Sequence, residues 1–87
     1  MNISVLGCGR WGSFIAWYLC NRGYDVRLWG PPGGKSYEIL KNTGANEYVA
    51  LDSRIRLTCD LEEAVTRAEI IVISISSQGL RGFVERI

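Results

Sequence analysis

Three glycines near the N-terminus have a spacing that brings a phosphate group against the backbone. Gly7, Gly9 and Gly12 form the pattern G-x-G-x-x-G. Gly7 permits the tight turn that leaves a strand, Gly9 lets the backbone approach a pyrophosphate, and Gly12 lets a helix pack closely on that strand. The phosphates would lie at the helix N-terminus, where unpaired N–H groups and the positive end of the helix dipole attract anions. The pattern therefore predicts the binding of a dinucleotide.

The residues on either side of these glycines have the order that this chemistry requires. A short β-type run, Ile3 to Leu6, comes directly before Gly7. An amphipathic helical pattern follows, with apolar side chains at Trp11, Phe14, Ile15, Tyr18 and Leu19. A chain with 10 glycines can contain the pattern by chance, but the order strand, glycine turn and helix makes the prediction of a dinucleotide site specific.

Length and charge narrow the classes of function. The 87 residues make one small domain, with a formal net charge of +1 and no histidine. The chain therefore lacks the strong positive charge that is typical of proteins that bind nucleic acid, and we expect no nucleic-acid partner. The longest apolar run, Ile70 to Ile73, is far too short for a membrane span. The first strand begins at once, without a signal peptide before it, so we expect a cytoplasmic protein.

The three cysteines, Cys8, Cys20 and Cys59, are odd in number and widely spaced. This arrangement fits neither a disulfide framework nor a zinc site, and we expect no metal. Cys8 lies in the glycine turn near a helix N-terminus, where a thiolate would be favoured. We favour the simpler interpretation, in which Cys8 is a small side chain that fills the turn.

Strand and helix alternate along the rest of the chain. Gly23 stops the first helix, and the segment Gly30-Pro31-Pro32-Gly33-Gly34 can belong to neither a helix nor a sheet. Ser76 or Ser77 can cap a last helix that carries an apolar stripe from Leu80 to Ile87. In chain order we expect strand 2–6, helix 10–22, strand 25–29, helix 36–42, strand 55–58, a short helix after Asp60, strand 69–74 and that last helix.

Asp60 and Glu63 have the spacing of a capping box at the start of the short helix. In that motif Asp60 accepts a hydrogen bond from the N–H of Glu63, and the Glu63 carboxylate reaches back to the N–H of Asp60. The helix would then turn its apolar side chains inward, namely Leu61, Ala64 and Val65.

This order of elements predicts an open parallel sheet with helices on both faces, the α/β architecture of the Rossmann type. Right-handed crossovers place about four strands in the order 3-2-1-4. Strand 69–74 contains the unbroken run Ile-Ile-Val-Ile, which predicts burial on both faces. The same order leaves that strand at an edge unless something covers it, and a homodimer through this edge is one expected assembly. A complete fold has about six strands, so we expect an incomplete sheet and interpret 1–87 as part of a longer protein, or as a truncated product that associates.

Several segments resemble the N-terminal, cofactor-binding domain of the NAD(P)-dependent glycerol-3-phosphate dehydrogenases. Gly7-x-Gly9-x-Trp11-Gly12-Ser13 is similar to the family's opening G-x-G-x-W-G-[ST], and Val26-Arg27-Leu28-Trp29-Gly30 is similar to its second strand. Residues 60–64 (DLEEA) and 68–72 (AEIIV) resemble its D-L-E-E-A…A-D-I-I-V segment. Ser77-Gln78 with Leu80-Arg81 resembles the S-Q-x-[LF]-R that follows strand four. The tryptophan of the first motif is the most family-specific element.

The resemblance implies reversible hydride transfer between dihydroxyacetone phosphate and sn-glycerol 3-phosphate. It also implies that the catalytic lysine and the helical substrate domain lie beyond Ile87, so no catalytic residue is assigned in this chain. The chain alone is expected to bind the cofactor without turnover, and the phosphorylated polyol only together with the remaining domain. Three alternatives stay open: a stand-alone dinucleotide-binding or regulatory module, the cofactor domain of another 3-hydroxyacid or ketopantoate-type reductase, and a degenerate glycine turn that binds nothing, since Arg10 and the two prolines are unusual.

The candidates for contact with the cofactor gather in three segments. They are Gly7, Gly9, Arg10, Trp11, Gly12, Lys35, Ser74 and Ser76. Arg10 stands where the family usually has a small residue, and it either pairs with a phosphate or points to solvent. Trp11 either lies against the cofactor or packs on the core. Ser74 and Ser76 lie at the end of strand four, at the strand C-termini where open α/β sheets bind ligands.

The end of the second strand bears on which dinucleotide is bound. The acidic residue that binds a ribose 2′-OH, expected roughly 20 positions after the glycines, is missing, because Gly30-Pro31-Pro32 stands there. Asp25 begins the strand and is too early to reach a ribose. Without a carboxylate nothing repels a 2′-phosphate, and Lys35 either swings onto one or stays a solvated loop residue. The cofactor is therefore predicted as NAD(P), with a slight preference for NADP.

Overall fold

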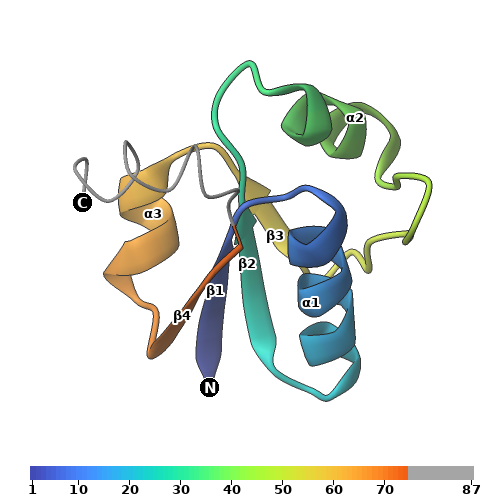
Figure 1. Ribbon diagram of the computed structural model, residues 1–87. Coiled ribbons are helices and arrows are strands. Elements are labelled where there is room, and N and C mark those ends of the chain that lie inside the picture. Colours follow the sequence, from blue (N-terminus) through green and yellow to red (C-terminus); the bar gives the residue numbers. More distant parts are fainter. Residues whose placement is uncertain (75–87) are drawn as a thin grey trace.

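A parallel sheet of four strands forms the centre of the molecule (Figure 1). The computed structural model describes residues 1–74. Its elements are β1 (Asn2–Leu6), α1 (Arg10–Asn21), β2 (Asp25–Trp29), α2 (Lys35–Thr43), β3 (Arg56–Thr58), α3 (Leu61–Thr66) and β4 (Ile70–Ile73). The strands are parallel and stand in the order β3-β2-β1-β4. The predicted Rossmann-type sheet and its strand order are confirmed.

Helices cover both faces of the sheet (Figure 1). On one face, Val5, Val26 and Leu28 form a core with side chains of α1 and α2. On the other face, Leu6 and Trp29 pack with α3. Successive residues of β1 and β2 thus turn alternately to the two cores, as the pleat of a strand requires. Both strands are well buried because each has a strand on either side and helices above and below.

α1 rests on the sheet with its small side chains and not with its aromatic ones. The buried residues of this helix are Gly12, Ser13, Ala16 and Cys20. Of the apolar side chains expected to face the core, only Ile15 and Leu19 pack against it. The exposed ones are Trp11, Phe14 and Tyr18. The prediction of the buried face was wrong for these three, because the helix approaches the sheet so closely that only small side chains fit between the two.

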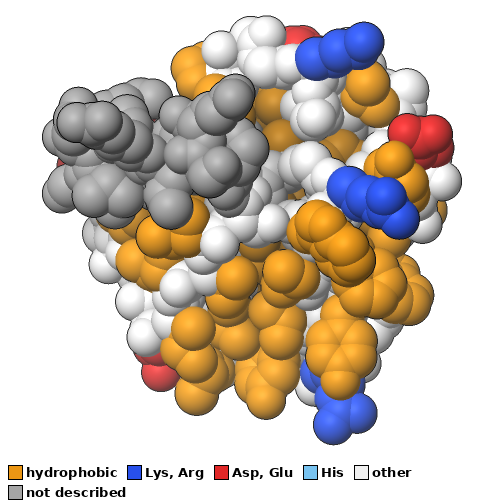
Figure 2. Space-filling model, in the orientation of Figure 1, with side chains coloured by type: hydrophobic (Ala, Val, Ile, Leu, Met, Phe, Trp, Pro, Cys, Tyr) orange, Lys and Arg blue, Asp and Glu red, His pale blue; other side chains and the backbone are white. Residues whose placement is uncertain are grey.

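β4 is an edge strand, and its burial differs from the prediction. Ile70, Ile71 and Ile73 keep 44%, 45% and 44% of their surface exposed, although the unbroken apolar run predicted burial on both faces. In the described part of the chain only β1 flanks β4, so the strand lacks the second neighbour that helps to bury β1 and β2. Figure 2 shows hydrophobic side chains over this edge and along α1.

Asp60 caps α3, but only half of the predicted capping box forms. Asp60 Oδ1 accepts hydrogen bonds from the N–H groups of Glu62, at 3.0 Å, and Glu63, at 3.3 Å. The Glu63 carboxylate accepts instead from the Arg56 guanidinium and the Thr58 hydroxyl, and the Asp60 N–H donates to Thr58 Oγ1. Side chains of β3 thus replace the return half of the box. As predicted, the helix turns its apolar side chains inward, namely Leu61, Ala64 and Val65.

The remaining elements agree closely with the expected ones. Gly23 ends α1 with a φ of +93°, and the bounds of α1, α2, β3 and β4 differ from the predicted ranges only at their ends. The expected last helix, with its cap at Ser76 or Ser77 and its stripe from Leu80 to Ile87, lies outside the described residues. Among the helices of residues 1–74, none has the length and apolar character needed to cross a membrane.

Candidate cofactor site

The turn between β1 and α1 closes tightly around two of its glycines. Gly7 has a φ of +116°, a conformation that L side chains rarely adopt. Its N–H donates a hydrogen bond of 2.8 Å to the Trp29 carbonyl, which ties the turn to the end of β2. A Cβ on Gly12 would stand 1.7 Å from the Gly7 carbonyl oxygen. The predicted structural roles of Gly7 in the turn and of Gly12 in close packing are thus those that the geometry requires.

Gly9 is different, because nothing in the described part of the chain requires a glycine there. Its φ of −75° is open to any residue. A Cβ built on it would meet no atom within 4 Å. Gly9 is the N-cap of α1, so this open space lies at a helix N-terminus. A ligand can therefore approach the backbone at the position where the glycine pattern predicts a pyrophosphate.

The first N–H groups of α1 have no capping side chain. Within residues 1–74, the N-cap Gly9 offers no side-chain acceptor to these N–H groups, and the first turn of the helix has no acidic residue. The first N–H groups of a helix have no partner inside the helix, and here no carboxylate offsets the positive end of the dipole. Open space, N–H groups and positive potential coincide, so these residues fit a dinucleotide pyrophosphate.

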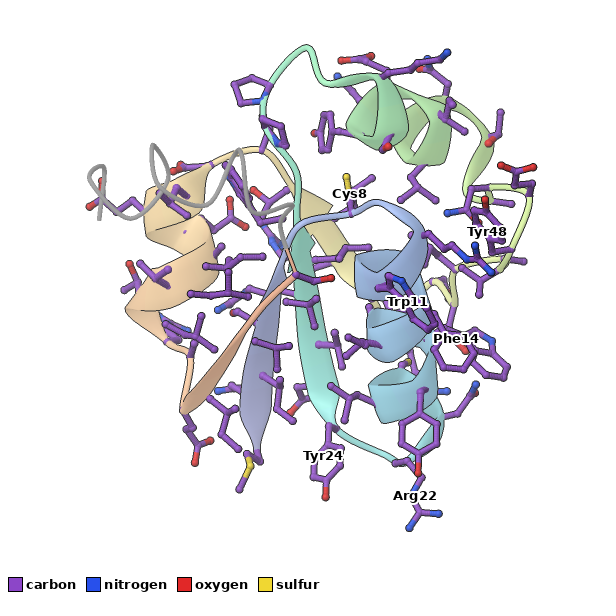
Figure 3. The ribbon with its side chains drawn as sticks, in the orientation of Figure 1. Cys8, Trp11, Phe14, Arg22, Tyr24 and Tyr48 are labelled. Carbon is purple, nitrogen blue, oxygen red and sulfur yellow. The ribbon has the colours of Figure 1, made fainter. Side chains whose placement is uncertain are left out.

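Arg10 and Trp11 project from this first turn, and both are exposed. The guanidinium carbon of Arg10 lies 5.5 Å from the centre of the Trp11 ring and 5.1 Å from that of the Tyr48 ring, within cation–π range. Figure 3 shows Trp11 and Tyr48 beyond the same end of α1. Trp11 is 64% exposed, so the interpretation that packed it on the core is wrong. Arg10 reaches the surface, as one of its two predicted alternatives requires, but two aromatic rings hold it.

Tyr48 belongs to a loop that is fastened to the start of α1. Asn46 Nδ2 donates to Ser13 Oγ at 2.9 Å. Asn46 Oδ1 accepts from the N–H groups of Tyr48, at 2.8 Å, and Val49, at 2.9 Å. Ser13 Oγ in turn donates to the Gly9 carbonyl at 2.7 Å. One hydrogen-bonded chain therefore connects the loop to the N-cap of the helix.

A cleft of about 200 Å³ opens between this loop, α2 and the glycine turn. The residues that line it are Gly9, Arg10, Ser36, Ile39, Asn46, Glu47 and Tyr48. Sequence reasoning missed Asn46 and Tyr48, since their relation to Arg10 arises only from tertiary contact. The one local signal was an asparagine in an irregular segment, a residue type that often bonds to the backbone two positions on.

The other predicted site residues lie at two places around the turn. Lys35 is the exposed first residue of α2, directly before Ser36 of the cleft. The Ser74 N–H donates to the Leu6 carbonyl at 2.8 Å, and Ser74 Cβ lies 3.6 Å from the position of a Cβ on Gly12. Ser76 lies outside the described residues. The structure thus brings Ser74 to the glycine turn and leaves Lys35 on the neighbouring helix.

The position directly after β2, Gly30, has no room for a side chain. A Cβ on Gly30 would stand 2.4 Å from Cys8 Sγ and 2.9 Å from Tyr37 Cβ. Cys8 and Tyr37 both belong to the larger core, so these neighbours cannot withdraw into solvent. Packing therefore explains why a carboxylate is missing at Gly30, because the space beside it is already filled.

Cys8 fills the turn, as the simpler interpretation of its role predicts. The side chain is only 3% exposed, and burial raises the pKa of its thiol. Burial therefore disfavours the thiolate, in agreement with the simpler interpretation of Cys8.

The chain is similar to known proteins over nearly its whole length. The family model described as the N-terminus of NAD-dependent glycerol-3-phosphate dehydrogenase matches residues 2–87. A glycerol-3-phosphate dehydrogenase (NAD(P)+) of Thermoanaerobacter sp. is 38% identical over 89 residues, which cover 100% of this chain and 27% of the relative. A protein of the same name from Latilactobacillus sakei is 34% identical over 90 residues, covering 100% of this chain and 26% of the relative.

Solved structures support the same assignment. A crystal structure of glycerol-3-phosphate dehydrogenase from Coxiella burnetii superimposes with a TM-score of 0.84 and 26% identity, covering 98% of this chain and 27% of that one. A diketoreductase at 24% identity, with a TM-score of 0.65 over 97% of this chain and 35% of that one, shows likeness of fold alone. The chain thus spans 27% and 26% of the length of the two curated relatives.

Motifs, sheet order and relatives agree on one assignment. The family match and the names of the relatives support a nicotinamide dinucleotide as the cofactor of this domain, and the open start of α1 fits the pyrophosphate of such a molecule. The chain belongs to the family of the NAD-dependent glycerol-3-phosphate dehydrogenase N-terminus.

Proposed function

We propose that residues 1–87 form the cofactor-binding domain of an enzyme that transfers a hydride reversibly between dihydroxyacetone phosphate and sn-glycerol 3-phosphate. Family membership and the names of the relatives support this activity over that of other reductases. A nicotinamide dinucleotide, when bound, supplies or accepts the hydride. The groups that would bind and orient it are the glycine turn together with Arg10, Trp11, Lys35, Ser74 and Ser76.

The observation that carries the proposal is the open space at Gly9. Gly7 and Gly12 are explained by the fold itself, through a positive φ and a close backbone contact. Gly9 has no restrictive φ, and no atom of the described residues 1–74 beyond its chain neighbours lies within 4 Å of a Cβ built on it. A glycine with no structural reason, at the uncapped start of a helix, is accounted for by a ligand that must touch the backbone.

A titration with NADH and NADPH, followed by tryptophan emission, tests this directly. We expect quenching in the wild-type chain and its loss in Gly9→Val, because the valine side chain would occupy the space of the pyrophosphate. The unfolding temperature of Gly9→Val is the control, and we expect it to stay close to that of the wild type. Absence of quenching by millimolar nucleotide, or quenching that survives in Gly9→Val, contradicts the proposal.

We also propose a slight preference for NADPH over NADH. The end of β2 offers no carboxylate to repel a 2′-phosphate, and Lys35 begins α2 close by. Lys35→Met is expected to weaken NADPH binding and to leave NADH binding unchanged. Lys41→Met, at the other end of α2, is the matched control. An equal effect of Lys35→Met on both nucleotides would remove this part of the proposal.

The reaction itself is proposed to need residues from outside this chain. We place no general acid, general base or polyol contact in residues 1–74. The purified chain is therefore expected to bind NADPH without oxidising it when dihydroxyacetone phosphate is added. Oxidation that depends on dihydroxyacetone phosphate, measured by the absorbance of NADPH, would show instead that the chain carries the catalytic groups.

The exposed edge supports one further part of the proposal. A homodimer through β4 would cover Ile70, Ile71 and Ile73, and sedimentation of the wild type against Ile71→Lys tests it. A single monomeric species in both would refute the dimer.

We place the protein in the cytoplasm, where its free thiols, Cys8, Cys20 and Cys59, would stay reduced. Cell fractionation checks the location.

A further inference from the structure

The position of Arg10 is determined by aromatic rings and not by a carboxylate. Its guanidinium carbon is 5.1 Å from the Tyr48 ring and 5.5 Å from the Trp11 ring. Within residues 1–74 the ion pairs are those of Arg54 with Asp52 and of Arg56 with Glu63, and neither includes Arg10. The Arg10 cation is therefore held at the cofactor site without being neutralised, and it remains available to an anion.

Tyr48 reaches Arg10 because its loop is anchored to α1. The bond from Asn46 Nδ2 to Ser13 Oγ fixes the loop to the first turn of the helix, and the Asn46 amide oxygen holds the N–H of Tyr48. The loop is closed at its base by the bond from the Leu51 N–H to the Gly44 carbonyl, at 2.9 Å. These contacts place the Tyr48 ring at the mouth of the cleft beside Gly9.

We propose that Tyr48 is a positioning residue for the cofactor: it orders the Arg10 guanidinium beside the glycine turn, so that Arg10 meets a phosphate group of the dinucleotide. This inference rests on the proposed function, since it names how that same site gains affinity. The phosphate is either the pyrophosphate, common to both nucleotides, or the 2′-phosphate of NADP(H). Glu47 also lines the cleft, and within residues 1–74 it forms no ion pair with Arg10.

The expected effect follows from the cost of ordering a long side chain. An arginine that is already fixed before the ligand arrives loses less rotamer freedom on binding. One such side chain changes a dissociation constant by about three- to tenfold. Because the cation–π contact depends on the face of the ring and not on the hydroxyl, Tyr48→Phe should preserve the effect and Tyr48→Leu should abolish it.

A double-mutant cycle on the 87-residue chain tests the inference, with dissociation constants of NADH and NADPH measured by calorimetry. The variants are Tyr48→Leu, Tyr48→Phe, Arg10→Met and the double variant Arg10→Met/Tyr48→Leu. Tyr24→Leu is the matched control, because Tyr24 is an exposed tyrosine at the far end of α1 (Figure 3). We expect Tyr48→Leu to weaken binding about three- to tenfold in the wild-type background and to have no effect once Arg10 is methionine. Tyr48→Phe and Tyr24→Leu should bind as the wild type does.

The outcomes show which phosphate group of the nucleotide Arg10 contacts. Equal losses for NADH and NADPH assign the contact to the pyrophosphate, and a loss confined to NADPH assigns it to the 2′-phosphate; either result supports the inference. A wild-type chain that binds both nucleotides but is insensitive to Tyr48→Leu overturns the inference and leaves the proposed function intact. So does an equal loss from Tyr48→Leu with and without Arg10. A wild-type chain that binds neither nucleotide overturns both.

Discussion

α1 and α3 pack on opposite faces of the sheet, and their N-termini are capped in opposite ways. α3 is closed by its own sequence, because Asp60 accepts from two of its first N–H groups and Glu62 and Glu63 stand in its first turn. α1 has a glycine as its N-cap, and within residues 1–74 it has no side chain that caps its first N–H groups and no acid in its first turn. The fold thus satisfies one helix N-terminus internally and leaves the other for an anion.

This difference separates stability from function within one small domain. A capped helix start stabilises the chain whether or not a ligand is present. An uncapped start gives up that stabilisation and keeps its N–H groups and its dipole available. Changes at the start of α3 should therefore affect folding and leave binding unchanged, and changes at Gly9 should affect binding far more than folding.

The largest expected effect is a difference in stability between substitutions at two glycines of the same turn, Gly12 and Gly9. Gly12→Ala would place a Cβ 1.7 Å from a backbone oxygen, whereas the same change at Gly9 meets nothing within 4 Å. We expect Gly12→Ala to destabilise the fold by about 3 kcal/mol or more, which lowers the unfolding temperature by more than roughly 10 °C in a domain of this size. Gly9→Ala should melt close to the wild type. Thermal unfolding of the pair is the measurement, and equal melting temperatures would contradict the geometry.

The next effect comes from giving α1 the cap that α3 has. Gly9→Asp should bond the first N–H groups of α1 and stabilise the helix by about a few tenths of a kcal/mol, because glycine is itself a fair N-cap residue. The same carboxylate should weaken NADH binding by at least about tenfold, because it occupies the N–H groups and repels the phosphates. Gly9→Asn is the uncharged control, and its binding should fall between the two. Binding by Gly9→Asp as tight as the wild type's would mean that the cofactor does not use this helix start.

The converse change removes the cap from α3. Asp60→Ala leaves two N–H groups without their acceptor, and the expected loss is about 1 kcal/mol, or roughly 4–8 °C in unfolding temperature. Asp60→Asn keeps an acceptor oxygen and should lose much less. NADH affinity should be the same in all three proteins at a temperature where each is folded. A loss of affinity in Asp60→Ala would show that the two helix starts are not independent.

The smallest expected effect on stability comes from Asp52, a second aspartate that, like Asp60, accepts a hydrogen bond from a backbone N–H. Asp52 Oδ1 accepts from the Arg54 N–H at 2.8 Å and from Arg54 Nε at 3.0 Å, and the side-chain bond with Arg54 is the main reason that the pKa of Asp52 is lowered to about 2. A lowered pKa means that the stabilisation exists above the unfolded value and is lost as pH falls toward about 2. The carboxyl resonance of Asp52, followed by NMR, should titrate near that value and move up in Arg54→Ala. An unchanged midpoint would refute the pairing.

Much of the fold could be predicted because its signals are local. β1 and β2 have the bounds that their apolar runs and flanking glycines indicated, and Asp60 caps the helix that its spacing predicted. The roles of Gly7 and Gly12 could also be predicted, because the turn requires a positive φ at Gly7 and a close backbone contact at Gly12. Periodicity and turn chemistry act over a few residues, so one sequence is enough to identify them.

Features that depend on distance in space could not be predicted in this way. An apolar run indicates burial only if neighbours lie on both sides, and β4 has β1 on one side alone in the described part of the chain. The face of α1 was misjudged because size, and not hydrophobicity, decides which side chains fit against the sheet. The contact of Arg10 with Tyr48 joins segments far apart in sequence, and no spacing rule connects them.

The packing beside Gly30 limits how the nucleotide preference of this protein can evolve. A carboxylate for a ribose hydroxyl cannot be installed at Gly30 by one substitution, because its Cβ would collide with Cys8 Sγ and Tyr37 Cβ. Cys8→Ala removes the first obstacle, but the second is fixed to the backbone of α2 and yields only if that helix moves. Substitutions at these positions are therefore coupled. An acid at Gly30 itself would therefore first require changes that loosen the core around Cys8 and Tyr37.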